Sequence, residues 1–296
     1  MKKVYLLFTV LVWLLAFASC EKVSVEDLQN ADGEELEGGV RLRFRVTKFE
    51  QTNFEDPLTI TRASIGEVCN KINFAIYDTN NNRLKYVNQK SDDTDFGQIS
   101  VQVTPGTYRV LFLAHSCSGN ATTTNIEKIT FPDNKVTDTF YYSAELQVDE
   151  SKSYDIELKR VVSMFQLVVD DEIPQNVKKI KMYYTGGSST LNGLTGLGCV
   201  NSKQTEIRQV SSTEKGQVFQ AYTFLHDREG ALKMTVSALD GSDAVVKEIL
   251  FTDVPMTCNK VTKYQGALFG GGDNPQASTF ALGVDAEWEG TDTFPF

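Results

Sequence analysis

Apolar and polar residues alternate with a period of two along much of the chain, which is the pattern of half-buried β-strands. Residues 41–46 read Arg-Leu-Arg-Phe-Arg-Val, so arginines occupy every second position. The alternation returns in residues 99–103 and 108–114, on either side of Pro105-Gly106. Because proline fixes the first turn angle and glycine supplies a positive φ, these two segments are expected to form a hairpin.

The same pattern continues to the end of the chain, and helical periodicity is scarce, with one helical turn predicted at residues 124–129. Strands of five to eight residues separated by turns predict antiparallel sandwiches. We therefore expect an all-β fold of two tandem β-sandwich domains, residues 40–158 and 159–296. The other segments with this pattern are residues 72–76, 154–158, 165–169, 177–184, 218–225, 232–238, 245–251 and 280–288.

The first nineteen residues predict a secretory signal, because Lys2 and Lys3 precede an apolar run over residues 4–18. This run is shorter than the roughly 20 residues of a membrane-spanning helix. Phe17-Ala18-Ser19-Cys20 resembles the bacterial lipobox, with Phe where Leu is usual. It predicts cleavage before Cys20 and a covalent lipid on that cysteine, which would hold the protein at a membrane. The alternative is a plain signal peptide with a coincidental cysteine.

Residues 20–39 are expected to be a lipidated, disordered tether. Residues 21–39 hold seven acids and one base, a composition that favours disorder because little apolar surface can be buried. The whole chain of 296 residues has 29 Lys and Arg against 39 Asp and Glu, and the mature chain has 27 against 39, or −12. This acidic balance argues against nucleic acid as a partner.

Four cysteines remain after Cys20, an even number in a chain that is expected to be exported. The pairs Cys69–Cys117 and Cys199–Cys258 would each close a loop inside one predicted domain. Each disulfide would stabilise the fold by about 4 kcal/mol in the chain-entropy model. The alternative is that all four are buried free thiols.

The sequence offers no catalytic or metal-binding motif, so we do not expect an enzyme, a bound metal or a cofactor other than the covalent lipid. There are two histidines, His115 and His226. Residues 78–82 begin like a calcium loop, but Arg83 occupies the position that requires glycine, so a hairpin turn is favoured. Patterns such as HExxH, GxSxG and CxxC do not occur.

Four stretches carry a resemblance to a known family. Residues 71–82 (KINFAIYDTNNN) and 103–119 (VTPGTYRVLFLAHSCSG) resemble the N-terminal domain of Bacteroidales fimbrillins. Residues 158–174 (LKRVVSMFQLVVDDEIP) and 260–269 (KVTKYQGALF) resemble the fimbrillin-associated anchor lipoproteins. The resemblance implies transthyretin-like sandwich domains in a subunit of a surface fimbria, or pilus.

In that family, stalk subunits lose their first strand to an arginine-specific protease, and a strand from the neighbouring subunit fills the groove. The anchor subunit stays lipidated and uncut at the base. The resemblance thus implies an anchor or minor fimbrial subunit, with stalk subunits as partners, held by lipid in the outer membrane and exposed at the cell surface.

Two alternatives remain open. The chain is a stalk or tip subunit if it is cleaved after Arg62, a residue that is otherwise an ordinary loop arginine. It is a glycan-binding surface lipoprotein if its tyrosines form a sugar platform, although tyrosine in strands usually serves packing. The candidate tyrosines are Tyr141, Tyr142, Tyr183 and Tyr184.

The C-terminal segment has one strongly apolar face and follows a glycine-rich stretch, residues 270–275. We expect it to be donated to the first stalk subunit as a complementing strand. The alternative is a closing strand of the second sandwich, because period-two patterning indicates burial and not the partner. The apolar face consists of Phe280, Leu282, Val284, Ala286 and Trp288.

Overall fold

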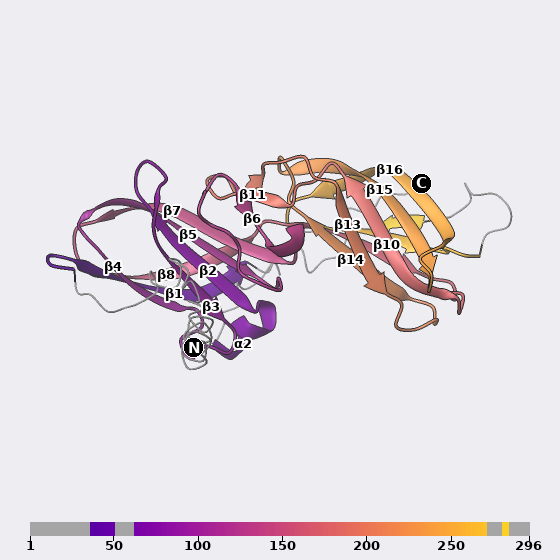
Figure 1. Ribbon diagram of the computed structural model, residues 1–296, viewed down its shortest axis with the longest axis horizontal. Coiled ribbons are helices and arrows are strands. Elements are labelled where there is room, and N and C mark those ends of the chain that lie inside the picture. The colour runs from indigo at the N-terminus through magenta and orange to yellow at the C-terminus, as the bar shows by residue number, and fades with distance from the viewer. Residues whose placement is uncertain (1–35, 51–61, 271–279, 284–296) are drawn as a thin grey trace, which may run out of the picture. The chain divides into compact units, whose positions relative to one another are not determined.

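The computed structural model describes residues 36–50, 62–270 and 280–283 (Figure 1). Strands make up most of these residues, which confirms the all-β prediction. The predicted signal peptide, Cys20 and most of the acidic tether lie outside the described residues. The described part contains one α-helix, α2 (Arg62–Val68), and one 3-10 helix, η2 (Pro132–Asn134). Neither is long and apolar enough to cross a membrane.

The first sheet has seven strands in the order β3-β2-β5-β7-β8-β1-β4. Strands β7 and β8 pair only at Phe140–Arg160 and Tyr141–Lys159, so the sheet divides into two parts, β3-β2-β5-β7 and β8-β1-β4. Strand β1 is antiparallel to β4 and parallel to β8. The strands are β1 (Val40–Glu50), β2 (Lys71–Tyr77), β3 (Arg83–Lys90), β4 (Gln98–Val103), β5 (Gly106–His115), β7 (Thr139–Val148) and β8 (Lys152–Arg160).

Apolar side chains from both parts of this sheet fill one core. The ring of Phe44 in β1 lies 5.3 Å from that of Phe74, 5.4 Å from that of Phe112 and 5.3 Å from that of Tyr154. A β-bulge between Val46 and Lys48 shifts the register by one residue, which turns the next apolar residue of β1 inward. The inward residues Leu42, Phe44, Val46 and Phe49 are at most 2% exposed.

Two four-stranded sheets enclose a second core. Their orders are β13-β10-β15-β16 and β14-β9-β17-β18, and β9 and β17 are parallel. The inward row of β10, from Val177 to Tyr184, packs against β15 and β9 in this core. The strands are β9 (Ser163–Val169), β10 (Val177–Thr185), β13 (Gln204–Gln209), β14 (Gln217–Thr223), β15 (Glu229–Asp240), β16 (Val245–Thr257), β17 (Val261–Gly266) and β18 (Phe280–Gly283).

A third, small sheet joins segments that are distant in sequence. Strand β6 (Ile129–Thr130) pairs with β11 (Thr190–Asn192), which also pairs with β12 (Leu197–Gly198). Near it, apolar residues from both sides of the β8–β9 connection form a third cluster, here called the junction core. Phe131 and Phe224 meet there, with ring centroids 5.4 Å apart.

Two predictions of local structure are wrong. The expected hairpin at Pro105-Gly106 does not form, because β4 pairs with β1 whereas β5 pairs with β2 and β7. The expected helical turn at residues 124–129 is instead a single turn at residues 126–127, closed by the Lys128 N–H donating to the Asn125 carbonyl at 3.1 Å. There the side chain of Asn125 accepts the Glu127 N–H at 2.9 Å, an alternative to helical backbone bonding.

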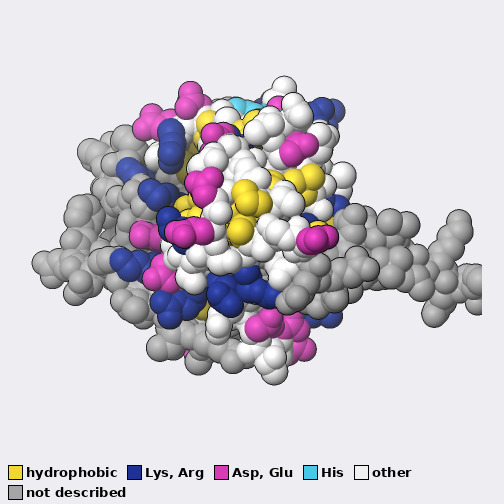
Figure 2. Space-filling view, turned by 90° about the vertical axis from the view of Figure 1, so that its left-hand side faces the viewer, with side chains coloured by type: hydrophobic (Ala, Val, Ile, Leu, Met, Phe, Trp, Pro, Cys, Tyr) yellow, Lys and Arg dark blue, Asp and Glu magenta, His cyan; other side chains and the backbone are white. Residues whose placement is uncertain are grey.

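Figure 2 shows the surface at one end of the molecule. Charged side chains of both signs are interspersed on it, with Lys and Arg gathered in a band and hydrophobic side chains confined to small patches. A mixed charged surface of this kind favours solubility. Over the described residues, no group of three or more His, Cys, Asp or Glu side chains is arranged to hold a metal ion.

Candidate functional site

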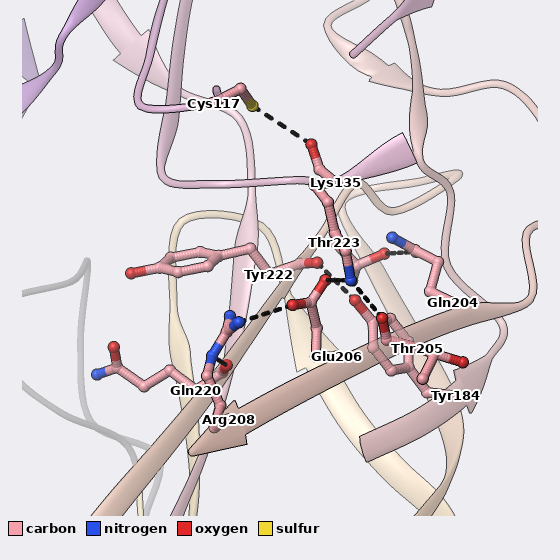
Figure 3. A network of polar contacts seen from close by, with 10 residues as sticks. All are labelled: Cys117, Lys135, Tyr184, Gln204, Thr205, Glu206, Arg208, Gln220, Tyr222 and Thr223. Atoms are coloured by element: carbon pink, nitrogen blue, oxygen red, sulfur yellow. Dashed lines mark hydrogen bonds and ion pairs between the residues drawn. The ribbon is translucent and has the colours of Figure 1, made fainter. Parts of the chain in front are cut away.

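The candidate functional site is a polar network beside the junction core, where segments from the two sides of the β8–β9 connection meet (Figure 3). Its centre is Glu206 on β13, a carboxylate whose residue is only 4% exposed. Lys135 Nζ lies 2.9 Å from Glu206 Oε1, and Arg208 Nη1 lies 2.8 Å from Glu206 Oε2. Lys135 also donates to the Thr205 carbonyl. Two cations therefore compensate the charge of this buried carboxylate.

Local turn geometry brings Lys135 to this position. It follows η2, where Asp133 and Asn134 adopt positive φ values of 56° and 53°, and its N–H donates to the Pro132 carbonyl. Aspartate and asparagine tolerate this left-handed conformation better than most residues. The tight turn thereby places a lysine from before the β8–β9 connection against a strand that follows it.

The network continues from Lys135 into the first half of the chain. The Cys117 thiol donates to the Lys135 carbonyl at 3.3 Å, and the Cys117 N–H donates to His115 Nδ1 at 3.2 Å. His115 Nε2 lies 2.7 Å from Asn73 Oδ1, which also accepts the Ala121 N–H at 2.9 Å. Since Nδ1 accepts and Oδ1 can only accept, these contacts fit a neutral imidazole protonated at Nε2.

Burial controls the ionisation of His115. Its side chain is fully buried, and this desolvation, with a smaller effect from Lys71, lowers the His115 pKa to about 3. The imidazole therefore stays neutral at ordinary pH and serves as a hydrogen-bonding link. It is not placed as a proton carrier for a substrate.

On the other side of Glu206 the network ties two sheets together. Arg208 Nε donates to the Gln220 carbonyl of β14 at 3.2 Å, and Tyr184 OH donates to the Tyr222 carbonyl at 2.8 Å. These bonds join the β13-β10 sheet to the β14 edge of the facing sheet. Burial raises the pKa of the Tyr184 hydroxyl, so it remains a donor.

Close packing beside this network depends on a glycine. Tyr141 OH donates to the Gly193 carbonyl at 2.9 Å, and the Gly193 N–H donates to the Ile126 carbonyl. A Cβ at position 193 would lie 2.8 Å from Ile129 Cδ1 and 2.9 Å from Ile126 Cγ1. Position 193 therefore requires glycine, and the packing and hydrogen bonds together hold the two halves of the chain in contact.

The four described cysteines are free thiols, so neither predicted disulfide is present in the structure. Instead, each of three thiols has a carbonyl acceptor, at Ile65 for Cys69, Lys135 for Cys117 and Thr190 for Cys199. Burial raises the pKa of the Cys69 thiol to about 12, which suppresses the thiolate that disulfide formation needs. Cys258 is also buried.

The other predicted site residues lie apart from this network. Arg62 is the first residue of α2 and not part of a loop. Phe280 and Leu282 lie in β18, which pairs with β17 of the same chain. Cys20 lies outside the described residues, as do three predicted donor residues, Val284, Ala286 and Trp288.

The four candidate tyrosines do not form one surface. Tyr184 is 1% exposed in the second core, whereas Tyr183 is 36% exposed and alternates with it on β10. Tyr142 packs on the first core, 6.3 Å from Phe112. These four tyrosines therefore do not present one common platform for a sugar.

The sequence does not identify Glu206 as a site residue, because β13 buries polar side chains and exposes an apolar one, the reverse of the usual pattern. Residues 204–209 read Gln-Thr-Glu-Ile-Arg-Gln, and the strand buries Gln204 and Glu206 while Ile207 is 48% exposed. Reading the strand by hydrophobicity places Ile207 inside and Glu206 outside. No signal in the sequence identifies Lys135 as the partner, since it lies 71 residues away.

A comparison of the sequence with known protein families gives one match. The sequence profile of DUF6562, described as a family of unknown function, matches residues 36–294. No curated protein matches the chain in sequence.

Solved structures are similar to the chain at low sequence identity. A candidate polysaccharide-binding protein (DUF1812) from Bacteroides thetaiotaomicron has a TM-score of 0.52 and 11% identity over 86% of this chain and 98% of its own. A candidate adhesin from Bacteroides ovatus has a TM-score of 0.52 and 11% identity over 83% of this chain and 93% of its own. The fimbrial anchor protein Mfa2 from Porphyromonas gingivalis has a TM-score of 0.44 and 8% identity over 86% of this chain and 97% of its own. At such identities a shared fold does not transfer a function.

Proposed function

The chain belongs to the DUF6562 family, whose function is unknown, and we propose that it is a surface lipoprotein acting as the anchor or a minor subunit of a fimbria. The signal peptide and the lipobox ending at Cys20 support export and attachment to the outer membrane by lipid. The fold that it shares with a candidate adhesin is compatible with such a role. Joining to neighbouring stalk subunits is proposed to occur by strand complementation.

The observation that carries this proposal is the place of β1 in the first sheet. It lies between β4 and β8, and four of its side chains fill the core. Burial of four large apolar side chains contributes on the order of 6–12 kcal/mol. The only covalent link from β1 to the rest of the fold runs forward through residues 51–61 to Arg62.

A cut after Arg62 would leave β1 held by noncovalent contacts alone. Its departure would open a groove between β4 and β8, lined by the partners of Phe44, with backbone groups free on both sides. A strand with alternating apolar residues would fit this groove. An uncut chain keeps the groove filled, as expected of an anchor that ends a row of subunits.

The anchor would then join its neighbour by giving a strand. The C-terminal segment has the alternating pattern, and its first part, β18, is the last strand of its sheet among the described residues, with four residues paired to β17. An edge strand has one partner instead of two and is more easily exchanged than β1. We propose that residues 280–288 include the donated strand.

N-terminal sequencing and lipid analysis of the protein purified from cells tests the attachment. A chain that begins at lipidated Cys20 supports the anchor, and a chain that begins at Ala63 supports a polymerising stalk or tip subunit and overturns it. The Cys20→Ala variant should become soluble or remain unprocessed. Cys199→Ala is the matched control and should stay on the membrane, because this thiol lies within the folded body.

Deletion of residues 276–296 tests strand donation. The expected result is loss of attachment to stalk subunits while the remaining chain keeps a cooperative thermal transition. Loss of that transition would show instead that the segment closes its own sandwich. Retention of the fimbria at wild-type level would exclude the segment as the donor.

A further inference from the structure

The outward face of β1 carries three arginines at alternate positions, Arg41, Arg43 and Arg45, here called the arginine row. Residues two apart in a strand point to the same face and lie about 6.6–6.8 Å apart. Arg43 and Arg45 are exposed, and Arg41 is half-buried. The chain as a whole has a net charge of −10, so this row runs against the overall charge.

The neighbouring strands contribute mostly neutral polar residues to this face. In β4, Arg41 lies opposite Gln102, Arg43 opposite Ser100 and Arg45 opposite Gln98. In β8, Arg43 lies beside Ser153 and Arg45 beside Asp155. Each arginine is thus flanked by hydroxyl or amide groups that can both donate and accept hydrogen bonds.

Acidic side chains on and next to β8 neutralise the arginine row only in part. Arg45 forms an ion pair with Asp155 at 2.9 Å, but the two side chains are 64% and 62% exposed, so water competes for both groups. Arg41 Nη1 contacts Ser100 Oγ at 3.5 Å. Glu157, an exposed acid two residues beyond Asp155 on β8, lies level with Lys48, which is a cation outside the row. The acids Asp149 and Glu150 precede β8 and lie before its first residue paired with β1, Lys152.

We propose that the arginine row binds a linear polysaccharide that carries carboxylates. A guanidinium group offers a planar fork of donors that matches a carboxylate, and three such groups in line suit an extended polyanion. The serine and glutamine side chains at positions 98, 100, 102 and 153 supply partners for sugar hydroxyls. The row and its flanking side chains therefore combine the two kinds of contact that an acidic sugar chain needs.

Other anionic polymers fit this face less well. Single-stranded nucleic acid is bound by stacking its bases on aromatic side chains, and the cross-strand neighbours of the arginine row contain none. A lipid surface is bound with apolar side chains among the cations, and this face also lacks them at the same positions. Hydroxyl and amide groups beside the arginines favour a sugar polymer.

The inference goes beyond the fimbrial role but rests on it in one respect: the arginine row lies on β1, which a chain cut after Arg62 would hold by noncovalent contacts alone and could exchange. The test therefore uses the uncut mature chain, residues 21–296, produced without lipid. It needs no fimbria. Failure to bind sugar would leave the anchor role standing, and failure of the anchor role would appear as a chain starting at Ala63.

Isothermal titration with polygalacturonate, at about 50 mM and about 300 mM salt, measures the binding. The probe is expected to bind at low salt and to weaken at high salt, while dextran, a neutral polysaccharide, does not bind. Arg43→Gln should lower the affinity about fivefold, and adding Arg45→Gln should lower it about 25-fold, if each exposed ion pair is worth up to about 1 kcal/mol.

The control is Lys233→Gln, which removes an exposed cation from β15 in another sheet and should leave the affinity unchanged. Thermal melting of each variant shows whether the fold is retained. Equal affinity of the Arg43→Gln variant and the wild-type protein would overturn the proposal, as would equal binding of dextran. Tighter, Arg43-dependent binding to phosphatidylglycerol vesicles than to polygalacturonate would assign the row to lipid phosphates instead.

Discussion

Replacing Lys135 by methionine tests whether the buried ion pair at the junction holds the two halves of the chain together. Methionine keeps most of the aliphatic stem and removes the ammonium group, which lies 2.9 Å from Glu206 Oε1. Glu206 would remain buried and would keep Arg208 as its single cationic partner. The change therefore weakens the compensation of a buried charge without removing it completely.

The stability cost of Lys135→Met depends more on the burial of Glu206 than on the distance between the two charged groups. Two unit charges 2.9 Å apart attract by about 6 kcal/mol at an effective dielectric constant of 20, which is an upper bound. The Lys135 side chain is 44% exposed, so solvent reduces this value, whereas that of Glu206 is 5% exposed. Loss of every partner of a buried ion costs about 3–5 kcal/mol. With Arg208 still present, we expect Lys135→Met to cost about 2 kcal/mol.

Urea denaturation and thermal melting measure this cost, and the melting temperature should fall by about 4–8 °C. The matched control is Lys179→Met, which removes the partner of Asp243 at 2.6 Å, a carboxylate whose side chain is 63% exposed. That variant should lose less than about 1 kcal/mol despite the shorter distance, because exposed ion pairs contribute little.

A double-mutant cycle then isolates the pair. In a Glu206→Gln background, Lys135→Met should cost less than about 1 kcal/mol, because the charge that it compensated is gone. If the cost of Lys135→Met is the same in both backgrounds, the ion pair does not stabilise the junction. Equal effects of Lys135→Met and Lys179→Met in the wild-type background would also refute the reasoning from burial.

Two further predictions concern pH and thiol reactivity. Because burial lowers the pKa of folded His115 to about 3, whereas the unfolded pKa is about 6.5, stability should fall by about 2 kcal/mol between pH 7 and pH 5 and continue to fall toward pH 3. Denaturation at several pH values measures this change, and an NMR titration of His115 near pH 6 would contradict it. In native protein, a thiol reagent should modify the partly exposed Cys199 first and the buried Cys69 only on unfolding. Mass spectrometry identifies the order, and recovery of disulfide-linked peptides would contradict it.

The sequence predicts the elements of this fold best where the determining contacts are local. The sequence predicts the turn at residues 78–82, and the Asp78 carboxylate there accepts the N–H groups of Asn80 and Asn82, each at 2.8 Å. The same arrangement recurs at Asp240, which closes the β15–β16 hairpin. In both turns the residue that specifies the structure lies within four positions of its partners.

The local sequence does not predict which distant strands pair with each other. Pro105-Gly106 has suitable turn chemistry, yet β4 pairs with β1, which lies more than fifty residues earlier. The bulge at Val46 is also hidden, because a strict period of two predicts that Lys48 faces inward in place of Phe49. Register and partner choice depend on the whole sheet.

The position of β1 connects the fimbrial role with the arginine row. Its inward side chains contribute to the first core, and its outward arginines form the row, so one strand carries both properties on opposite faces. Cleavage after Arg62 would allow both to be lost together, while an incoming strand would need to replace only the inward face to restore the core. A chain that keeps β1 therefore keeps its carboxylate-binding face, and one that exchanges β1 acquires whatever outward residues its neighbour supplies. In this way the processing step would decide which subunits of an assembly bind acidic polysaccharide, without any change elsewhere in the fold.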